Sequence, residues 1–135
     1  MELYDIKRGD RLESVKVKPF KFEKDIQKIV EGNLNELFDL QFVCTEFTIK
    51  NFRIDTLSFD KSNKSFVIIE YKKGKSYSVI DQGYSYLSMM LNHKSDFILE
   101  YNESTSNSLK RGDVDWTQSK VVFISPNFFS VDRKI

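Results

Sequence analysis

Three ionisable residues lie in or beside two apolar segments, where charged side chains are uncommon. Asp55 lies within segment 52–60, and Glu70 and Lys72 lie at the end of segment 65–72. Ionisable side chains rarely occur in buried strands unless they are paired or bind a metal. Two carboxylates could share a cation, and a lysine beside them could orient or help to deprotonate a water molecule. These residues are therefore the candidate centre of a reactive site.

The spacing of these residues predicts how two strands would bring them together. Both segments have strand-like composition, and a polar turn at 60–64 separates them. Side chains alternate along a strand, so Glu70 and Lys72 should share one face. If the turn pairs Asp60 with position 64 or 65, Asp55 lies opposite about Glu70. Segment 65–72 is apolar on both faces up to Ile69, which indicates a central strand.

A carboxylate pair of this kind suits Mg²⁺, which takes oxygen ligands and keeps several waters. The backbone carbonyl of Tyr71 could supply a further ligand. Two structural alternatives stay open at this point. Asp55 could pair with Arg53, and Glu70 with Lys72 could form an ordinary surface pair at a strand end.

Two predicted helices carry further candidates. Segment 21–38 has an amphipathic pattern, and Glu23 projects near the middle of its apolar face, with Glu31 toward the edge. Glu23 could instead complement the helix dipole from the first turn. In a second helix at 78–93, Gln82 and Tyr86 are four residues apart and share a face at the margin of the apolar stripe. They could reach a phosphate or a metal-bound water, or serve only in packing.

The remaining segments complete an α/β order with an αβββαβ core. An N-terminal β-hairpin is expected within 2–17, and strands at 41–49, at Ser95–Tyr101 and at Lys120–Ser125. Residues 102–118 are polar and indicate a loop, with room for one helical turn. With 135 residues and no linker or repeat, the chain is expected to form a single domain, 1–135.

Charge and composition narrow the expected partners. The formal net charge is only +1, which provides no overall basic field to attract nucleic acid. Arg53, Lys73 and Lys75 are the local candidates for phosphate contacts, although a run of lysines after a strand is also typical of a solvated turn.

Other features bear on location. No apolar run approaches the ~20 residues that span a bilayer, the N-terminus lacks a signal-peptide pattern, and Cys44 is the only cysteine. These features favour a cytoplasmic protein without a membrane partner.

With these residues in place, the sequence resembles the PD-(D/E)XK nuclease superfamily over roughly residues 23–101. The resemblance rests on four short segments, Phe22–Gln27, Phe52–Leu57, Val67–Lys72 and Asp81–Leu87. The chain is similar to an uncharacterised prokaryotic family and to archaeal endonucleases that cut mismatched or branched DNA. The resemblance implies a restriction-endonuclease-like mixed sheet flanked by helices, and DNA hydrolysis with Mg²⁺ or Mn²⁺. By position, the implied catalytic set is Glu23 (with Glu31 in reserve), Asp55, Glu70, Lys72, Gln82 and Tyr86, and the implied metal ligands are Asp55, Glu70 and Tyr71.

Several alternatives accompany the resemblance. RNA is a second candidate substrate, because no segment visible in the sequence accepts or rejects a 2′-hydroxyl. A non-catalytic nucleic-acid-binding or protein-interaction module on the same fold is the alternative function. The last predicted strand ends at Ser125, whereas members of the superfamily continue, so a C-terminal truncation and a homodimer both stay open.

Overall fold

A computed structural model describes residues 5–7, 11–13, 23–72, 79–125 and 129–133 of the chain. It begins with the expected hairpin, in which β1 (Asp5–Lys7) pairs antiparallel with β2 (Arg11–Glu13). Its helices are α1 (Glu23–Gly32), α2 (Leu34–Phe38), α3 (Val79–Asn92) and α4 (Lys94–Thr105). Among the described residues, no helix is long and apolar enough to cross a membrane.

The described strands after the hairpin form one mixed sheet in the order β3-β4-β5-β6-β7. Their bounds are β3 (Gln41–Ile49), β4 (Phe52–Asp60), β5 (Ser65–Tyr71), β6 (Lys120–Ile124) and β7 (Phe129–Arg133). The β5–β6 pair is parallel and the other neighbours are antiparallel. The predicted α/β class with a mixed sheet is confirmed, and β5 is the central strand, as its two-sided apolar pattern indicated.

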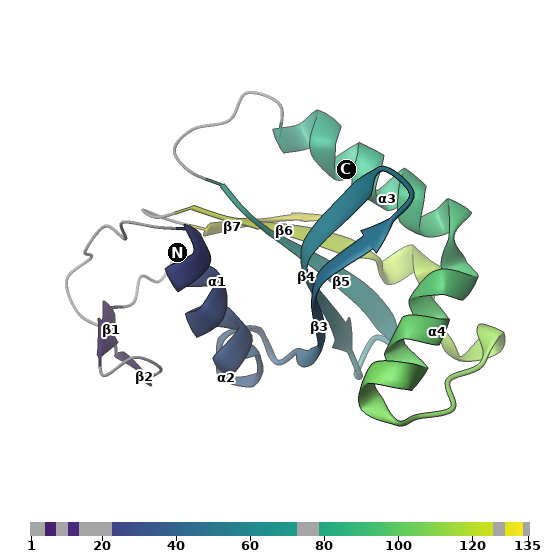
Figure 1. Ribbon diagram of the computed structural model, residues 1–135, viewed down its shortest axis with the longest axis horizontal. Coiled ribbons are helices and arrows are strands. Elements are labelled where there is room, and N and C mark those ends of the chain that lie inside the picture. Colours follow the sequence, from purple (N-terminus) through teal and green to yellow (C-terminus); the bar gives the residue numbers. More distant parts are fainter. Residues whose placement is uncertain (1–4, 8–10, 14–22, 73–78, 126–128, 134–135) are drawn as a thin grey trace.

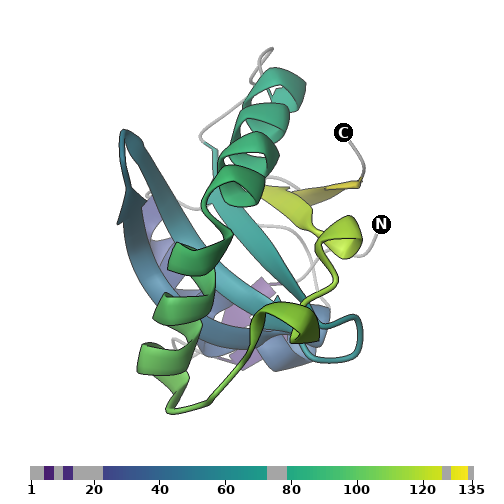
Figure 2. The same cartoon turned by 90° about the vertical axis from the view of Figure 1, so that its right-hand side faces the viewer.

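Helices cover both faces of this sheet (Figure 1). Val67, Ile69 and Tyr71 of β5 belong to the core beneath α1 and α2, and the alternate residues Phe66 and Ile68 belong to the core beneath α3 and α4. In the view turned by 90°, α3 and α4 lie in front of the sheet (Figure 2). Because side chains alternate along a strand, the residue after Ile69 points toward α3.

The strand predicted at Ser95–Tyr101 is wrong, because this segment lies inside α4. Phe97, Ile98 and Tyr101 are buried against the sheet while Leu99 is 57% exposed, which is a helical and not an alternating pattern. The last strand of the αβββαβ order is therefore β6.

The loop predicted over 102–118 is only partly correct. Its first residues belong to α4, which continues to Thr105, where the threonine hydroxyl donates to the Tyr101 carbonyl at 2.5 Å. Two 3₁₀ turns follow, at Arg111–Asp113 and Trp116–Gln118. The second turn is stabilised by Asp115, whose carboxylate accepts from the Thr117 N–H.

Two further expectations need correction. The helix predicted over 21–38 is interrupted at Asn33, which separates α1 from α2. The buried Asn33 side chain donates to the Ile29 carbonyl at 2.7 Å, and asparagine competes in this way with regular helical hydrogen bonding. The strand at 120–125 is also not the last one, because β7 lies beyond it and pairs with β6.

Candidate functional site

The register of β4 and β5 brings Asp55 and Glu70 together, as the sequence predicted. Pairing runs from Asp60↔Ser65 to Thr56↔Ile69, so Asp55 and Glu70 are the next residues along the two strands. There the carboxylates replace the backbone carbonyls as acceptors. The Asp55 N–H donates to Glu70 Oε2 at 2.6 Å, and the Tyr71 N–H donates to Asp55 Oδ2 at 3.0 Å. Each carboxylate thus bonds to the backbone of the opposite strand.

Burial perturbs both carboxyl groups. Burial and the charge of the neighbouring Asp55 raise the pKa of Glu70 from 4.5 to about 7, against hydrogen bonds from the Asp55 N–H and from Tyr86. Burial also raises the pKa of Asp55, while the Tyr71 N–H bond and the charges of Arg53 and Lys72 lower it. Two like charges in a desolvated position are the arrangement that a bound cation would stabilise.

Lys72 completes the predicted group of three. It directly follows β5, and its N–H donates to the Ile124 carbonyl at 2.7 Å, which fixes its backbone beside β6. The Lys72 side chain is half-buried, and its charge lowers the pKa of both Asp55 and Glu70. Glu70 itself is only 4% exposed, so the alternative of an ordinary surface pair with Lys72 is wrong. A cation in this position favours the ionised form of both carboxylates and can also face an anionic substrate.

The second predicted helix contributes Tyr86 directly. Its hydroxyl donates to Glu70 Oε1 at 2.7 Å and also lies 3.3 Å from the Arg53 carbonyl. Tyr86 is 6% exposed, so the prediction that it lies at the margin of the apolar stripe is wrong. Its ring can be buried because its hydroxyl has hydrogen-bond partners inside the protein. Gln82 is on the same helix, and its buried Oε1 has no hydrogen-bond partner among the described residues.

The first helix reaches the site through Gln27 and Glu31, which lie one turn apart on α1. The Gln27 amide donates to the Asp55 carbonyl at 2.9 Å. Glu31 Oε2 accepts from the Thr56 hydroxyl at 2.6 Å, and the Thr56 hydroxyl is 2.9 Å from the Tyr71 hydroxyl. A chain of polar contacts therefore joins α1 to the strands that carry the carboxylates.

Of the residues in this chain of contacts, the sequence indicated Glu31 only as a reserve and did not indicate Gln27 or Thr56. No feature of the α1 pattern distinguished Gln27 from the other polar residues of the helix, because its role depends on the docking of α1 on β4. Glu23 is the first residue of α1, and its side chain lies outside the described residues.

Of the residues predicted to contact phosphate, the structure describes Arg53 but not Lys73 or Lys75. Arg53 forms an ion pair with Glu46 at 2.6 Å, and both side chains are about half exposed. This pair replaces the alternative pairing of Arg53 with Asp55, and Arg53 would have to exchange partners to bind a phosphate. Lys73 and Lys75 lie outside the described residues.

The donor atoms fit a small hard cation better than a soft one. Asp55, Glu70 and the Tyr71 carbonyl offer only oxygen, which suits Mg²⁺ or Mn²⁺. Within the described ranges, no group of three or more His, Cys, Asp or Glu side chains is close enough to hold a metal ion. A cation here would therefore depend on two carboxylates, backbone oxygen, water and substrate.

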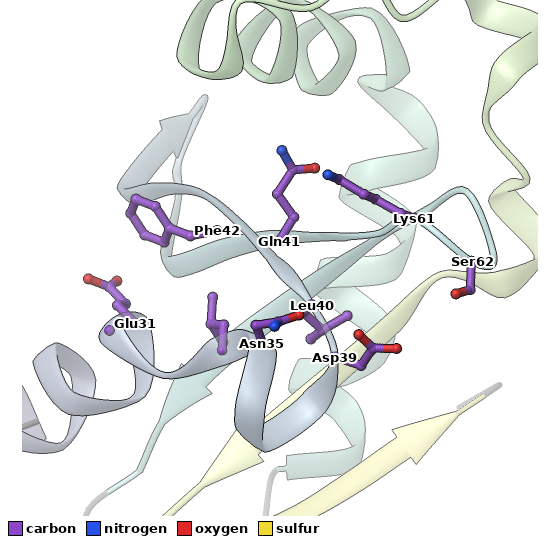
Figure 3. Close-up of a pocket in the computed structure, with 10 residues that line it drawn as sticks. Glu31, Asn35, Asp39, Leu40, Gln41, Phe42, Lys61 and Ser62 are labelled. Atoms are coloured by element: carbon purple, nitrogen blue, oxygen red, sulfur yellow. The ribbon is translucent and has the colours of Figure 1, made fainter. Parts of the chain in front are cut away.

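A pocket of about 380 Å³ lies elsewhere on the sheet, between α2, the start of β3 and the β4–β5 turn (Figure 3). Glu31 stands at one end of this pocket and Ser62 at the other. Lys61 follows β4 directly, six residues beyond Asp55, which is roughly 20 Å along an extended strand. Most of the pocket is thus remote from the carboxylate pair, and neither carboxylate lines it.

Comparison with known proteins finds a relative of this chain without a described activity. An uncharacterized protein of Haemophilus influenzae is 54% identical over 128 residues, which cover 95% of this chain and 42% of that protein. The chain thus spans less than half the length of this relative. No family model matches the chain, and no solved structure matches it.

Proposed function

We propose that this chain is a divalent-metal-dependent nuclease domain that hydrolyses phosphodiester bonds of DNA. The observation that carries the proposal is the meeting of Asp55 and Glu70 in a desolvated position, where the pairing of β4 with β5 ends, with Lys72 acting on both. Perturbed carboxyl groups with a nearby lysine are typical of reactive sites. The resemblance to the PD-(D/E)XK superfamily supports the same chemistry.

In this proposal each residue has a separate task. Asp55, Glu70 and the Tyr71 carbonyl would hold Mg²⁺ or Mn²⁺, which when bound lowers the pKa of water and neutralises phosphate charge. Lys72 would orient the attacking water or stabilise the charge that develops on the phosphate. Tyr86 holds one oxygen of Glu70, so it positions the carboxylate. Gln82 has a carbonyl oxygen without a hydrogen-bond partner in the part of the chain that the structure describes, and this oxygen could bind a water molecule.

A cleavage assay tests the proposal. Single-stranded, branched and mismatched DNA would be incubated with the protein and Mg²⁺ or Mn²⁺, beside an RNA strand. Lys72→Ala should lower the rate by about 100-fold or more, the usual loss for a group that stabilises transition-state charge. Lys61→Ala, in the exposed turn after β4, is the matched control and should cut at the wild-type rate. If the wild type and Lys72→Ala were equally inactive on every substrate, the proposed nuclease activity would be rejected.

One observation favours a second function, a non-catalytic binding module. Both oxygens of Glu70 already accept hydrogen bonds from the protein, and a pKa of about 7 leaves much of this group protonated near neutral pH. In that case the carboxyl pair only joins β4 to β5. Calorimetry separates the two functions: binding of nucleic acid with no uptake of Mn²⁺ at millimolar concentration would favour the module. A cytoplasmic location stays a prediction of the sequence.

A further inference from the structure

A second cavity lies beside the candidate site, on the side where α3 meets the start of β4. It measures about 440 Å³, within the range of roughly 300–1,000 Å³ found for ligand pockets. Its lining residues come from β4, from α3 and from the α3–α4 junction: Phe52, Tyr84, Ser85, Ser88, Met89, Asn92 and His93.

The lining of this cavity indicates an uncharged, planar ligand with polar edges. Apart from the ionisable His93, whose Nδ1 lies 3.7 Å from an Asp96 oxygen, the described lining side chains are uncharged at neutral pH. A phosphate would need lysine or arginine here. Aromatic rings offer stacking faces, and the hydroxyl and amide groups of Ser85, Ser88 and Asn92 can both donate and accept hydrogen bonds.

Tyr84 is the most available of these aromatic groups. It is 52% exposed although it is large and partly apolar, and it follows the buried Gly83 on α3. Exposed aromatic side chains on which bases stack are the common device of proteins that bind single-stranded nucleic acid.

The cavity is connected to the carboxylate pair through two aromatic rings. The Phe52 ring lies 5.9 Å from the Tyr86 ring, and the Tyr86 hydroxyl bonds to Glu70. Along β4, Phe52 precedes Asp55 by three residues, about 10 Å of extended strand. A base held in the cavity would therefore keep its own strand close to the carboxylates.

We infer that this cavity binds an unpaired nucleobase, stacked against Tyr84, so that the substrate class of the site is single-stranded or locally unpaired nucleic acid. The inference rests on the proposed function for its substrate, but base binding can be measured without cleavage. Duplex DNA keeps its bases stacked inside the helix and would present none to Tyr84 unless a base left the stack.

The test is fluorescence anisotropy in EDTA, where no metal-dependent cleavage takes place. Three labelled probes of equal length are compared: an oligothymidylate, a strand of abasic sites, and a duplex. The oligothymidylate should bind the wild type more tightly than the other two. Tyr84→Ala should weaken its binding by about 5- to 100-fold, as expected for the loss of one base–aromatic stack, and leave the abasic strand unchanged. Tyr84→Phe should retain the wild-type affinity.

Leu99→Ala, at an exposed apolar residue on α4, is the matched control and should bind all three probes as the wild type does. Circular dichroism checks that each variant is folded. Three results would overturn the base pocket. They are equal affinity of the wild type for the oligothymidylate and the abasic strand, an equal loss of affinity for both strands in Tyr84→Ala, or binding of neither strand. Metal-dependent, Lys72-dependent cleavage alongside any of these results would leave the nuclease proposal standing.

Discussion

Replacement of Glu70 by glutamine gives a quantitative test of the electrostatics of the site. In the folded protein the pKa of Glu70 is raised from 4.5 to about 7, chiefly by burial. At about 1.4 kcal/mol per pH unit, this rise corresponds to about 3 kcal/mol of stability that is present below pH 4.5 and lost as the pH rises through 7. The folded state binds the additional proton, so the free energy of unfolding falls as the pH rises.

Glu70→Gln should remove this dependence and keep the geometry. The glutamine Oε1 can accept from the Asp55 N–H, and its Nε2 can donate to the Tyr86 hydroxyl. Urea unfolding in EDTA, from about pH 4 to 8.5, measures both proteins. The wild-type value minus the variant value should fall by about 3 kcal/mol across this range, with most of the change between pH 4.5 and 7. If the difference between the two free energies of unfolding did not change with pH, burial would not raise the pKa of Glu70 and this reasoning would be refuted.

Other contacts of the site lead to three more tests. Thr56→Val should lower the free energy of unfolding by about 1–3 kcal/mol, because it leaves the Glu31 carboxylate and the buried Tyr71 hydroxyl without their shared partner. The control is Thr48→Val, at an exposed position of β3, and equal urea midpoints for Thr56→Val and the wild type would contradict this role of Thr56. Glu46→Gln frees Arg53 and should tighten oligonucleotide binding, measured by fluorescence anisotropy, by up to about fivefold. Arg53→Gln should weaken this binding and flatten its salt dependence, and an unchanged salt slope would show that Arg53 does not contact phosphate. Mn²⁺ binding should weaken about fivefold from pH 7 to pH 6 in calorimetry, because a proton on Glu70 competes with the metal; equal affinities would exclude Glu70 as a ligand.

The sequence was most informative where a short turn fixed the geometry. The polar segment after Asp60 left few ways to pair two strands, so the meeting of Asp55 with Glu70 could be predicted from spacing and alternation alone. Local rules sufficed because both residues belong to one hairpin.

Features that depend on packing between distant segments could not be predicted from the sequence in the same way. The run Phe97-Ile98-Leu99 resembled a strand, since a short apolar run does not distinguish a strand from a buried helix. Its helical state depends on packing against the sheet, where Phe97 and Tyr101 contact Phe66. Likewise, Gln27 and Thr56 are ordinary polar residues, and only the docking of α1 on β4 joins them to the site.

The most direct test of the central claim is the crystal structure of this protein soaked in Mn²⁺, with anomalous diffraction measured above pH 7. An anomalous peak is expected between the carboxylates of Asp55 and Glu70, within about 2.0–2.3 Å of oxygen from each. Asp55→Asn should lose the peak. The absence of a peak in the wild type, with the Lys72 ammonium bridging the two carboxylates, would contradict the metal site and leave the pair a structural role.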